Sequence, residues 1–240
     1  MKQEIVFTNG GLLVVTIRNW FKFFLNAMLI GGSITGVFSL VIRWNDFYAV
    51  HFSNGEWAEF FSGIIWFVIL GFTMSVIAQM GFFAYLTVHQ IGVNIFRSLT
   101  LWNWVQMLII VVTLVDLVLF RFKPYAHTAQ DWLLYIVLLL VLLAGSIATA
   151  IQKTRLTKKH VLVPALFFMI VVTTLEWLIA LWVRTDGGDE YVTLLLFPLL
   201  AVNAFQLLVL PKYNAKSDED ILKLEERRKA RRLAEASKAK

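Results

Sequence analysis

Long apolar segments separated by short polar ones constrain the fold of this chain more than any other feature. One of them, at residues 161–182, reads VLVPALFFMIVVTTLEWLIALW and contains a single ionisable residue, Glu176. About 20 residues of helix cross the hydrocarbon core of a bilayer. Hydrophobic residues make up 59% of the 240 and charged residues 16%, against roughly 45–50% and about 25% in soluble domains. The pattern therefore predicts membrane-spanning helices rather than one large soluble core.

Six such segments predict an all-α, polytopic integral membrane protein, a bundle of six transmembrane helices. We expect a short N-terminal segment at residues 1–17, a transmembrane domain at 18–211 and a basic, partly helical tail at 212–240. The predicted spans are residues 20–42, 59–88, 101–120, 131–151, 161–182 and 191–210. The 131–151 span is the most uniformly apolar, so we expect it to face lipid over much of its circumference. Isoleucines and a leucine recurring every four residues in 90–100 favour a short amphipathic helix at the interface.

The basic residues predict the orientation of these spans. Six spans place both termini on the same side of the membrane. With both termini cytoplasmic, 18 of the 22 Lys and Arg lie inside, and four lie outside: Arg43, Arg121, Lys123 and Arg184. Cytoplasmic segments carry such an excess of positive charge. This orientation places Asp116 and Glu176 in the outer half of the bilayer and Gln79 in the inner half.

Polar side chains inside the apolar segments form a predicted buried cluster of Asp116, Glu176, Asn203 and Gln206. A carboxylate in a span costs about 2.5 kcal/mol or more on insertion scales. We therefore expect Glu176 to face the bundle and pair with a basic or amide group, with Arg184 and Asn203 as candidates. Asp116 also fits an interfacial residue. Such groups either orient helices by hydrogen bonding or serve as a proton site, and the sequence leaves both open.

Small residues recur along the first two predicted spans. Gly32 and Gly36 are four residues apart, and Gly71, Ser75 and Gly81 follow in the second span. Small side chains let helix backbones approach closely within lipid. The spacing therefore predicts a helix-packing seam.

The tail after residue 211 holds ten of the basic residues. Ser217 and Asp220 have the spacing of a helix N-cap and its partner, and the run RRKARR follows. A basic run beside a membrane binds anionic lipid. We therefore predict lipid headgroup contacts by Arg227, Arg228, Lys229, Arg231 and Arg232.

The motifs of several enzyme classes do not occur in the sequence. We find no P-loop, HExxH or GxSxG pattern, and the four histidines are scattered. The absence of cysteine excludes disulfides, thiolate metal sites and a cysteine nucleophile. Most basic residues flank predicted spans, so we expect no nucleic-acid partner. No cofactor and no enzymatic activity are expected.

Three strings in the later spans carry a family resemblance. QMGFFAYLTVHQIG (residues 79–92), PALFFMIVVTTLEW (164–177) and FPLLAVNAFQLL (197–208), with RNWFKFF at 18–24, resemble the KinB-signalling pathway activation proteins, the KbaA family of spore-forming bacteria. The resemblance covers about residues 18–212. It implies a non-enzymatic, multi-pass protein of the bacterial cell membrane. It also implies a role in letting the sensor histidine kinase KinB, a two-component kinase, feed the sporulation phosphorelay.

Two functions follow from these observations. The first is a membrane accessory protein that activates a KinB-type kinase by packing its small-residue seam against the kinase's own membrane helices. The alternative is a small transporter or channel that produces the signal the kinase senses. That alternative predicts a polar site lined by Asp116, Glu176, Asn203 and Gln206. The oligomeric state is left open.

Overall fold

Helices account for nearly all of the chain that the structure, a computed structural model, describes: residues 17–157, 161–183 and 189–238. No strand occurs within these ranges. Six of the described helices are long and apolar enough to cross a membrane. The predicted all-α class is confirmed to that extent. The predicted N-terminal segment lies almost wholly outside the described residues.

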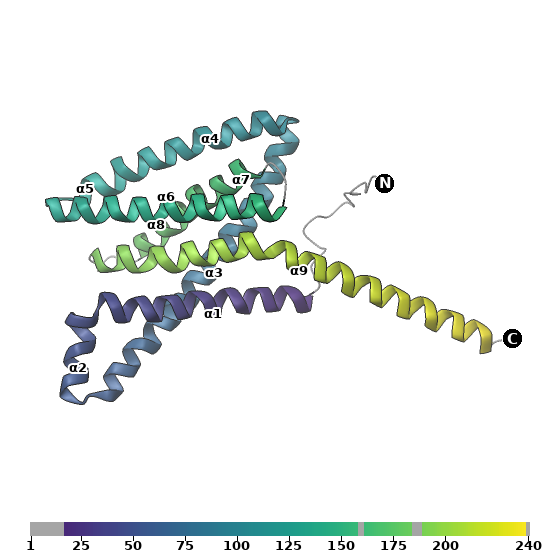
Figure 1. The fold of residues 1–240 in the computed structure, drawn as a ribbon, viewed down its shortest axis with the longest axis horizontal. Coiled ribbons are helices and arrows are strands. Elements are labelled where there is room, and N and C mark those ends of the chain that lie inside the picture. Colours follow the sequence, from purple (N-terminus) through teal and green to yellow (C-terminus); the bar gives the residue numbers. More distant parts are fainter. Residues whose placement is uncertain (1–16, 158–160, 184–188, 239–240) are drawn as a thin grey trace. The chain divides into compact units, whose positions relative to one another are not determined.

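Figure 1 shows the order of the elements along the chain. We name the short π-helical stretches, which Figure 1 does not label, η1 to η3. The α-helices and π-helices are α1 (Ile17–Ile42), η1 (Trp44–Tyr48), α2 (Ala49–Asn54), α3 (Trp57–Phe96), α4 (Leu99–Asp116), η2 (Leu117–Phe122), α5 (Lys123–Tyr125), α6 (Ala129–Thr157), α7 (Leu162–Phe167), η3 (Phe168–Val172), α8 (Thr173–Val183) and α9 (Asp189–Lys238).

Residues 90–100 do not form the separate short amphipathic helix that was predicted at the interface; they contain the junction of α3 and α4. Residues 90–96 continue α3, and the helix ends where Arg97 adopts a left-handed conformation with φ of 50°. Ser98 then caps α4, its hydroxyl accepting a hydrogen bond from the Leu101 amide at 3.3 Å. A side chain on Gly92 would strike the indole of Trp102. The missing side chain therefore lets α4 pack closely against the end of α3.

Contacts divide the chain into two compact units, residues 27–208 and residues 1–26 with 209–240. In the second unit, the start of α1 binds the later part of α9. Asn19 is buried, and its amide donates to the Ser217 hydroxyl and the Asp220 carboxylate, at 3.0 Å each. Arg18 also binds Asp220, at 2.9 Å. The predicted N-cap is therefore wrong: α9 runs through Ser217 without a break because these polar groups bind α1 instead.

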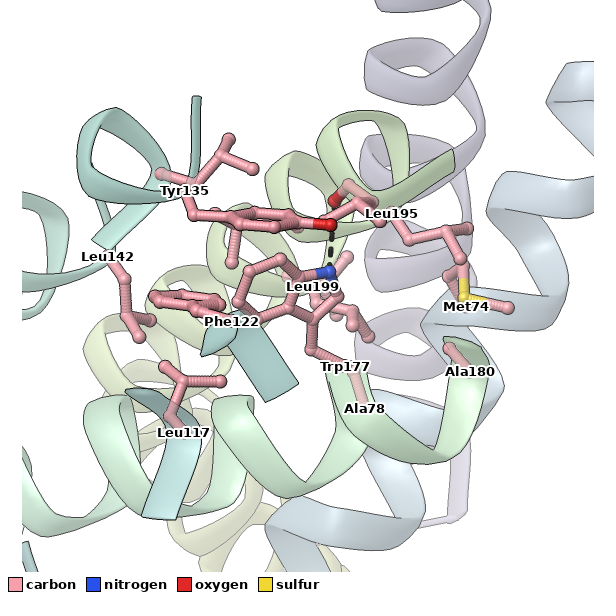
Figure 2. Packing of buried hydrophobic residues seen from close by; sticks show 14 of the residues in the cluster. Met74, Ala78, Leu117, Phe122, Tyr135, Leu142, Trp177, Ala180, Leu195 and Leu199 are labelled. Atoms are coloured by element: carbon pink, nitrogen blue, oxygen red, sulfur yellow. Dashed lines mark hydrogen bonds between the residues drawn. The ribbon is translucent and has the colours of Figure 1, made fainter. Parts of the chain in front are cut away.

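A buried aromatic group forms part of the core of the larger unit (Figure 2). Phe122 stacks on Tyr135, with ring centroids 5.0 Å apart and planes 5° from parallel. Trp177 lies edge-on to Phe122, and its indole N–H donates to the Val192 carbonyl at 2.9 Å. The cluster joins η2, α6, α8 and α9, with leucines filling the space around the rings.

The small-residue seam joins α1 to α3 within this chain. A side chain on Gly71 would collide with the Gly31 carbonyl and the Thr35 hydroxyl. Ser75 donates to the Ala27 carbonyl across the two helices at 3.1 Å. Gly32 lies against Phe72, and a Cβ on Gly36 would be 3.0 Å from Val68. Four of the seam residues therefore lie between α1 and α3 of this chain: Gly32, Gly36, Gly71 and Ser75. These contacts argue against the prediction that the seam receives the helices of a partner. The fifth residue, Gly81, lies against α8.

The spans differ in how much of their surface the protein itself buries. In the most apolar part of the Leu162–Leu181 span, 56% of residues are buried, against 33% in Ala129–Thr157 and 22% in Leu99–Tyr125. The 131–151 span was predicted to face lipid over much of its circumference, and two thirds of the most apolar part of its helix are not buried by the protein. The buried residues of α6 run from Tyr135 to Ala150. Hydrophobicity alone does not report which side of a uniformly apolar helix packs.

Candidate functional site around Glu176

Glu176 lies on α8 and is 3% exposed. The side-chain amide of Asn203, on α9, donates to the Glu176 carboxyl oxygen Oε2 at 2.5 Å. The same amide donates to the Thr173 hydroxyl at 2.9 Å. Thr173 and Glu176 are three residues apart and so share a helix face. One fully buried amide therefore joins α9 to two acceptors on α8.

A third helix completes the surroundings of Glu176. A Cβ on Gly81, in α3, would collide with the other carboxyl oxygen, Oε1, and would lie 3.1 Å from Val172. Glycine at this position therefore makes the space that the carboxyl group occupies. The contact also places Glu176 at the level of the α3 turn that contains Gln79. The structure therefore brings Glu176 close to the turn of Gln79, and α3, with 40 residues, extends well past the predicted span. The assignment of the two residues to opposite halves of the bilayer stays a prediction.

A π-helical turn precedes the site. It spans Phe168–Val172, immediately before Thr173, and such turns loosen the regular pairing of the backbone. Ser146 of α6 donates its hydroxyl proton to the Met169 carbonyl at 3.2 Å. The run of branched and aromatic residues gives no sequence signal for this turn.

Several buried polar atoms near these helices have no hydrogen-bond partner within the described part of the chain. They are Glu176 Oε1, Asn203 Oδ1, Thr174 Oγ1 and both amide atoms of Gln79 and Gln206. An unpaired buried polar group costs about 1–3 kcal/mol. The structure therefore buries Gln206, as predicted for it, but pairs it with neither Glu176 nor Asn203.

Asp116 does not belong to this group, which corrects the prediction that it is buried. It is exposed at the end of α4. Its neighbour Leu117 is 1% exposed and packs in the core. Successive residues of a helix are rotated by about 100°, so burial of Leu117 turns Asp116 outward.

Two of the basic residues predicted on the outer side, Arg43 and Arg121, contact groups other than Glu176. Arg43 forms an ion pair with Glu190 at 3.1 Å. The Arg121 guanidinium lies over the Tyr125 ring, 3.9 Å from its centroid. Arg184 lies outside the described residues. An amide rather than a cation therefore binds the Glu176 carboxyl.

In the basic tail, Arg227, Arg228 and Lys229 are exposed on α9. The side chains of Arg231 and Arg232 lie outside the part of the chain whose side chains the structure describes.

The described residues include no group of three or more His, Asp or Glu placed to hold a metal ion. The chemistry of the site is thus hydrogen bonding by one carboxyl group, amides and hydroxyls.

The fold and this site define the class: a helical protein with six helices long and apolar enough to cross a membrane, joined by buried polar contacts. The model of the family for KinB-signalling pathway activation in sporulation, KbaA, matches residues 31–213. The KinB-signaling pathway activation protein of Bacillus subtilis (strain 168) is 38% identical over 199 residues, covering 83% of this chain and 98% of the relative. The chain belongs to the KbaA family, as the resemblance predicted. No solved structure matches the chain.

Proposed function

We propose that this protein is a non-enzymatic accessory protein of the bacterial cell membrane that activates a KinB-type sensor histidine kinase feeding the sporulation phosphorelay. The observation that carries the proposal is the match to the B. subtilis activation protein, which extends over 98% of that relative. The six apolar helices support a location in the membrane. The excess of basic residues in the segments assigned to the inside supports cytoplasmic termini.

Activation by contact within the membrane is the mechanism we favour. A membrane protein shifts the balance between two states of a kinase only when its contacts with those states differ in free energy. The α1–α3 seam is occupied within the chain, so the contact surface lies elsewhere. In the tail, the exposed Arg227, Arg228 and Lys229 support binding to anionic lipid headgroups, and we extend this role to Arg231 and Arg232.

Complementation tests the proposal. The chain is expressed in a B. subtilis strain that lacks its own KinB-signaling pathway activation protein, and spore formation and the output of KinB are measured. Restoration of both is expected, and only while KinB is present. A strain lacking KinB is the control. If the chain accumulates in the membrane without raising KinB output, the proposal is rejected.

The unpaired buried atoms of Gln79, Glu176 and Gln206 favour a second candidate, a small transporter or channel that produces the signal sensed by the kinase. Glu176→Gln separates the two functions. Gln keeps an oxygen that accepts from Asn203, so contact-based activation survives. A proton relay needs an ionisable group and is lost. Kinase output of the variant in the complemented strain is the measurement.

A further inference from the structure

The exposed carboxylate of Asp116 is the starting point. It lies on α4, which belongs to the span with the smallest buried fraction, 22%. The described residues give Asp116 no ion pair. Ionisable residues within spans face the interior of a bundle or pair with a partner, because lipid solvates them poorly. Among the residues that the structure describes, Asp116 does neither.

The position of Asp116 within its span follows from the helix bounds. The apolar span Leu99–Tyr125 has 27 residues, and at about 1.5 Å per residue it is about 40 Å long. A hydrocarbon core is about 30 Å thick, so a centred span extends about 5 Å beyond it at each end. Asp116 lies about 14 Å before the end of this span at Tyr125. We therefore place Asp116 inside the hydrocarbon core that the span would cross.

A short side chain does not reach water from this depth. Lysine and arginine extend long apolar stems toward the interface, whereas aspartate has a single methylene group. Its neighbours on the helix surface are apolar and exposed: Val112 at 48%, Val115 at 48% and Leu119 at 47%. These four residues occupy the i, i+3, i+4 and i+7 positions of one helix face. The face has the form of a helix-packing surface with one hydrogen-bond acceptor at its centre.

We propose that the face formed by Val112, Val115 and Asp116 of α4 and Leu119 of η2 binds a transmembrane helix of the sensor kinase. Asp116 accepts a hydrogen bond there from an Arg, Lys, Asn or Gln side chain at the matching depth of that helix. This inference rests on the proposed function. Polar contacts of this kind join helices in membranes, where apolar surface alone gives no preference for protein over lipid. The acceptor thus specifies the chemistry of its partner.

A second copy of this chain fits the face less well. Two identical subunits meet around a two-fold axis, so each patch contacts itself. The two Asp116 carboxylates would then approach each other, and like charges repel. The charge of the face therefore favours a different chain that supplies a donor.

Photo-cross-linking tests the inference in the complemented strain. A photoreactive residue replaces Val112 of α4 or Leu119 of η2, and Leu133 or Leu140 of α6 in the matched controls. The control residues are also apolar and are 64% and 58% exposed. We expect the kinase to be captured from the Val112 and Leu119 positions and not from the α6 positions. Equal capture from both helices, capture of a second copy alone, or no capture while kinase output is restored would overturn the inference.

Substitution of Asp116 tests the acceptor itself. Asp116→Asn keeps an acceptor oxygen, whereas Asp116→Leu removes it and leaves an apolar surface suited to lipid. A hydrogen bond between helices contributes about 1–2 kcal/mol, so Leu should lower co-purification of the kinase roughly five- to thirty-fold. The midpoint of thermal unfolding of the isolated chain should not fall, since Asp116 is exposed and forms no ion pair with the described residues. Undiminished co-purification with Leu contradicts the inference. If the unmodified chain never raises KinB output in the complemented strain, the proposed function itself is rejected. The inference, which rests on that function, is then rejected as well.

Discussion

At the scale of single residues, the contact between Glu176 and Asn203 is the most sharply defined polar interaction of the bundle. Glu176→Ala removes the acceptor and leaves the Asn203 amide with the Thr173 hydroxyl alone. Loss of a buried hydrogen-bond partner costs about 1–3 kcal/mol. We expect Glu176→Ala to lower the midpoint temperature of thermal unfolding in detergent. Glu176→Gln should leave this temperature near the wild-type value. Equal midpoints for Ala and wild type would contradict a structural role for the hydrogen bond.

Gly81 supplies a second prediction at this scale. A methyl group on Gly81 displaces the Glu176 carboxyl, and the displacement weakens the bond to Asn203. Gly81→Ala should therefore destabilise the wild type more than it destabilises the Glu176→Ala variant. Contacting residues show coupling of about 0.5–3 kcal/mol in such cycles. A double-mutant cycle by thermal unfolding measures the coupling, and additive effects would show that the two residues do not interact.

At the scale of elements, the seam between α1 and α3 decides how closely two helices approach. The atoms that a Gly71 side chain would meet include the Gly31 carbonyl and the Gly32 Cα. Backbone atoms cannot rotate away, so Gly71→Ala must separate the helices. Overpacking costs about 1–3 kcal/mol. At Gly36 the nearest atom is a valine methyl group at 3.0 Å.

We therefore expect Gly71→Ala to lower the thermal midpoint clearly and Gly36→Ala to lower it less. A cysteine pair placed across α1 and α3, which is practical because the chain has no native cysteine, reports the same separation by its cross-linking rate. Similar midpoints for both alanine variants would mean that the helices do not approach at Gly71.

At the scale of the whole molecule, the absence of cysteine makes the orientation directly measurable. Single cysteines at Ser53 and His127 lie in exposed segments between spans, and one at Lys229 lies in the exposed tail. With cytoplasmic termini, an impermeant thiol reagent should label Ser53→Cys and His127→Cys in intact cells. Lys229→Cys should react only after lysis. The reverse pattern would contradict the orientation that we infer from the basic residues.

The sequence by itself predicted the class of this protein, because length and hydropathy are properties of each segment alone. Six apolar blocks predicted the six long helices, and strings around Gln79, Glu176 and Asn203 predicted the family. Glu176 stood out for the same local reason, a carboxyl group in an apolar run. The bounds were less accurate: α3 and α9 continue beyond their predicted spans, because a helix does not have to end where its hydrophobicity does.

Only the tertiary structure decided which side chains meet. It paired Glu176 with Asn203, placed Gly81 against the carboxyl group and turned Asp116 outward. It also used the small-residue seam within the chain. The physical reason is that hydropathy records how favourably a segment enters lipid, whereas partners depend on the rotation and relative height of whole helices. A uniformly apolar surface leaves both undetermined, so contacts between distant segments settle them.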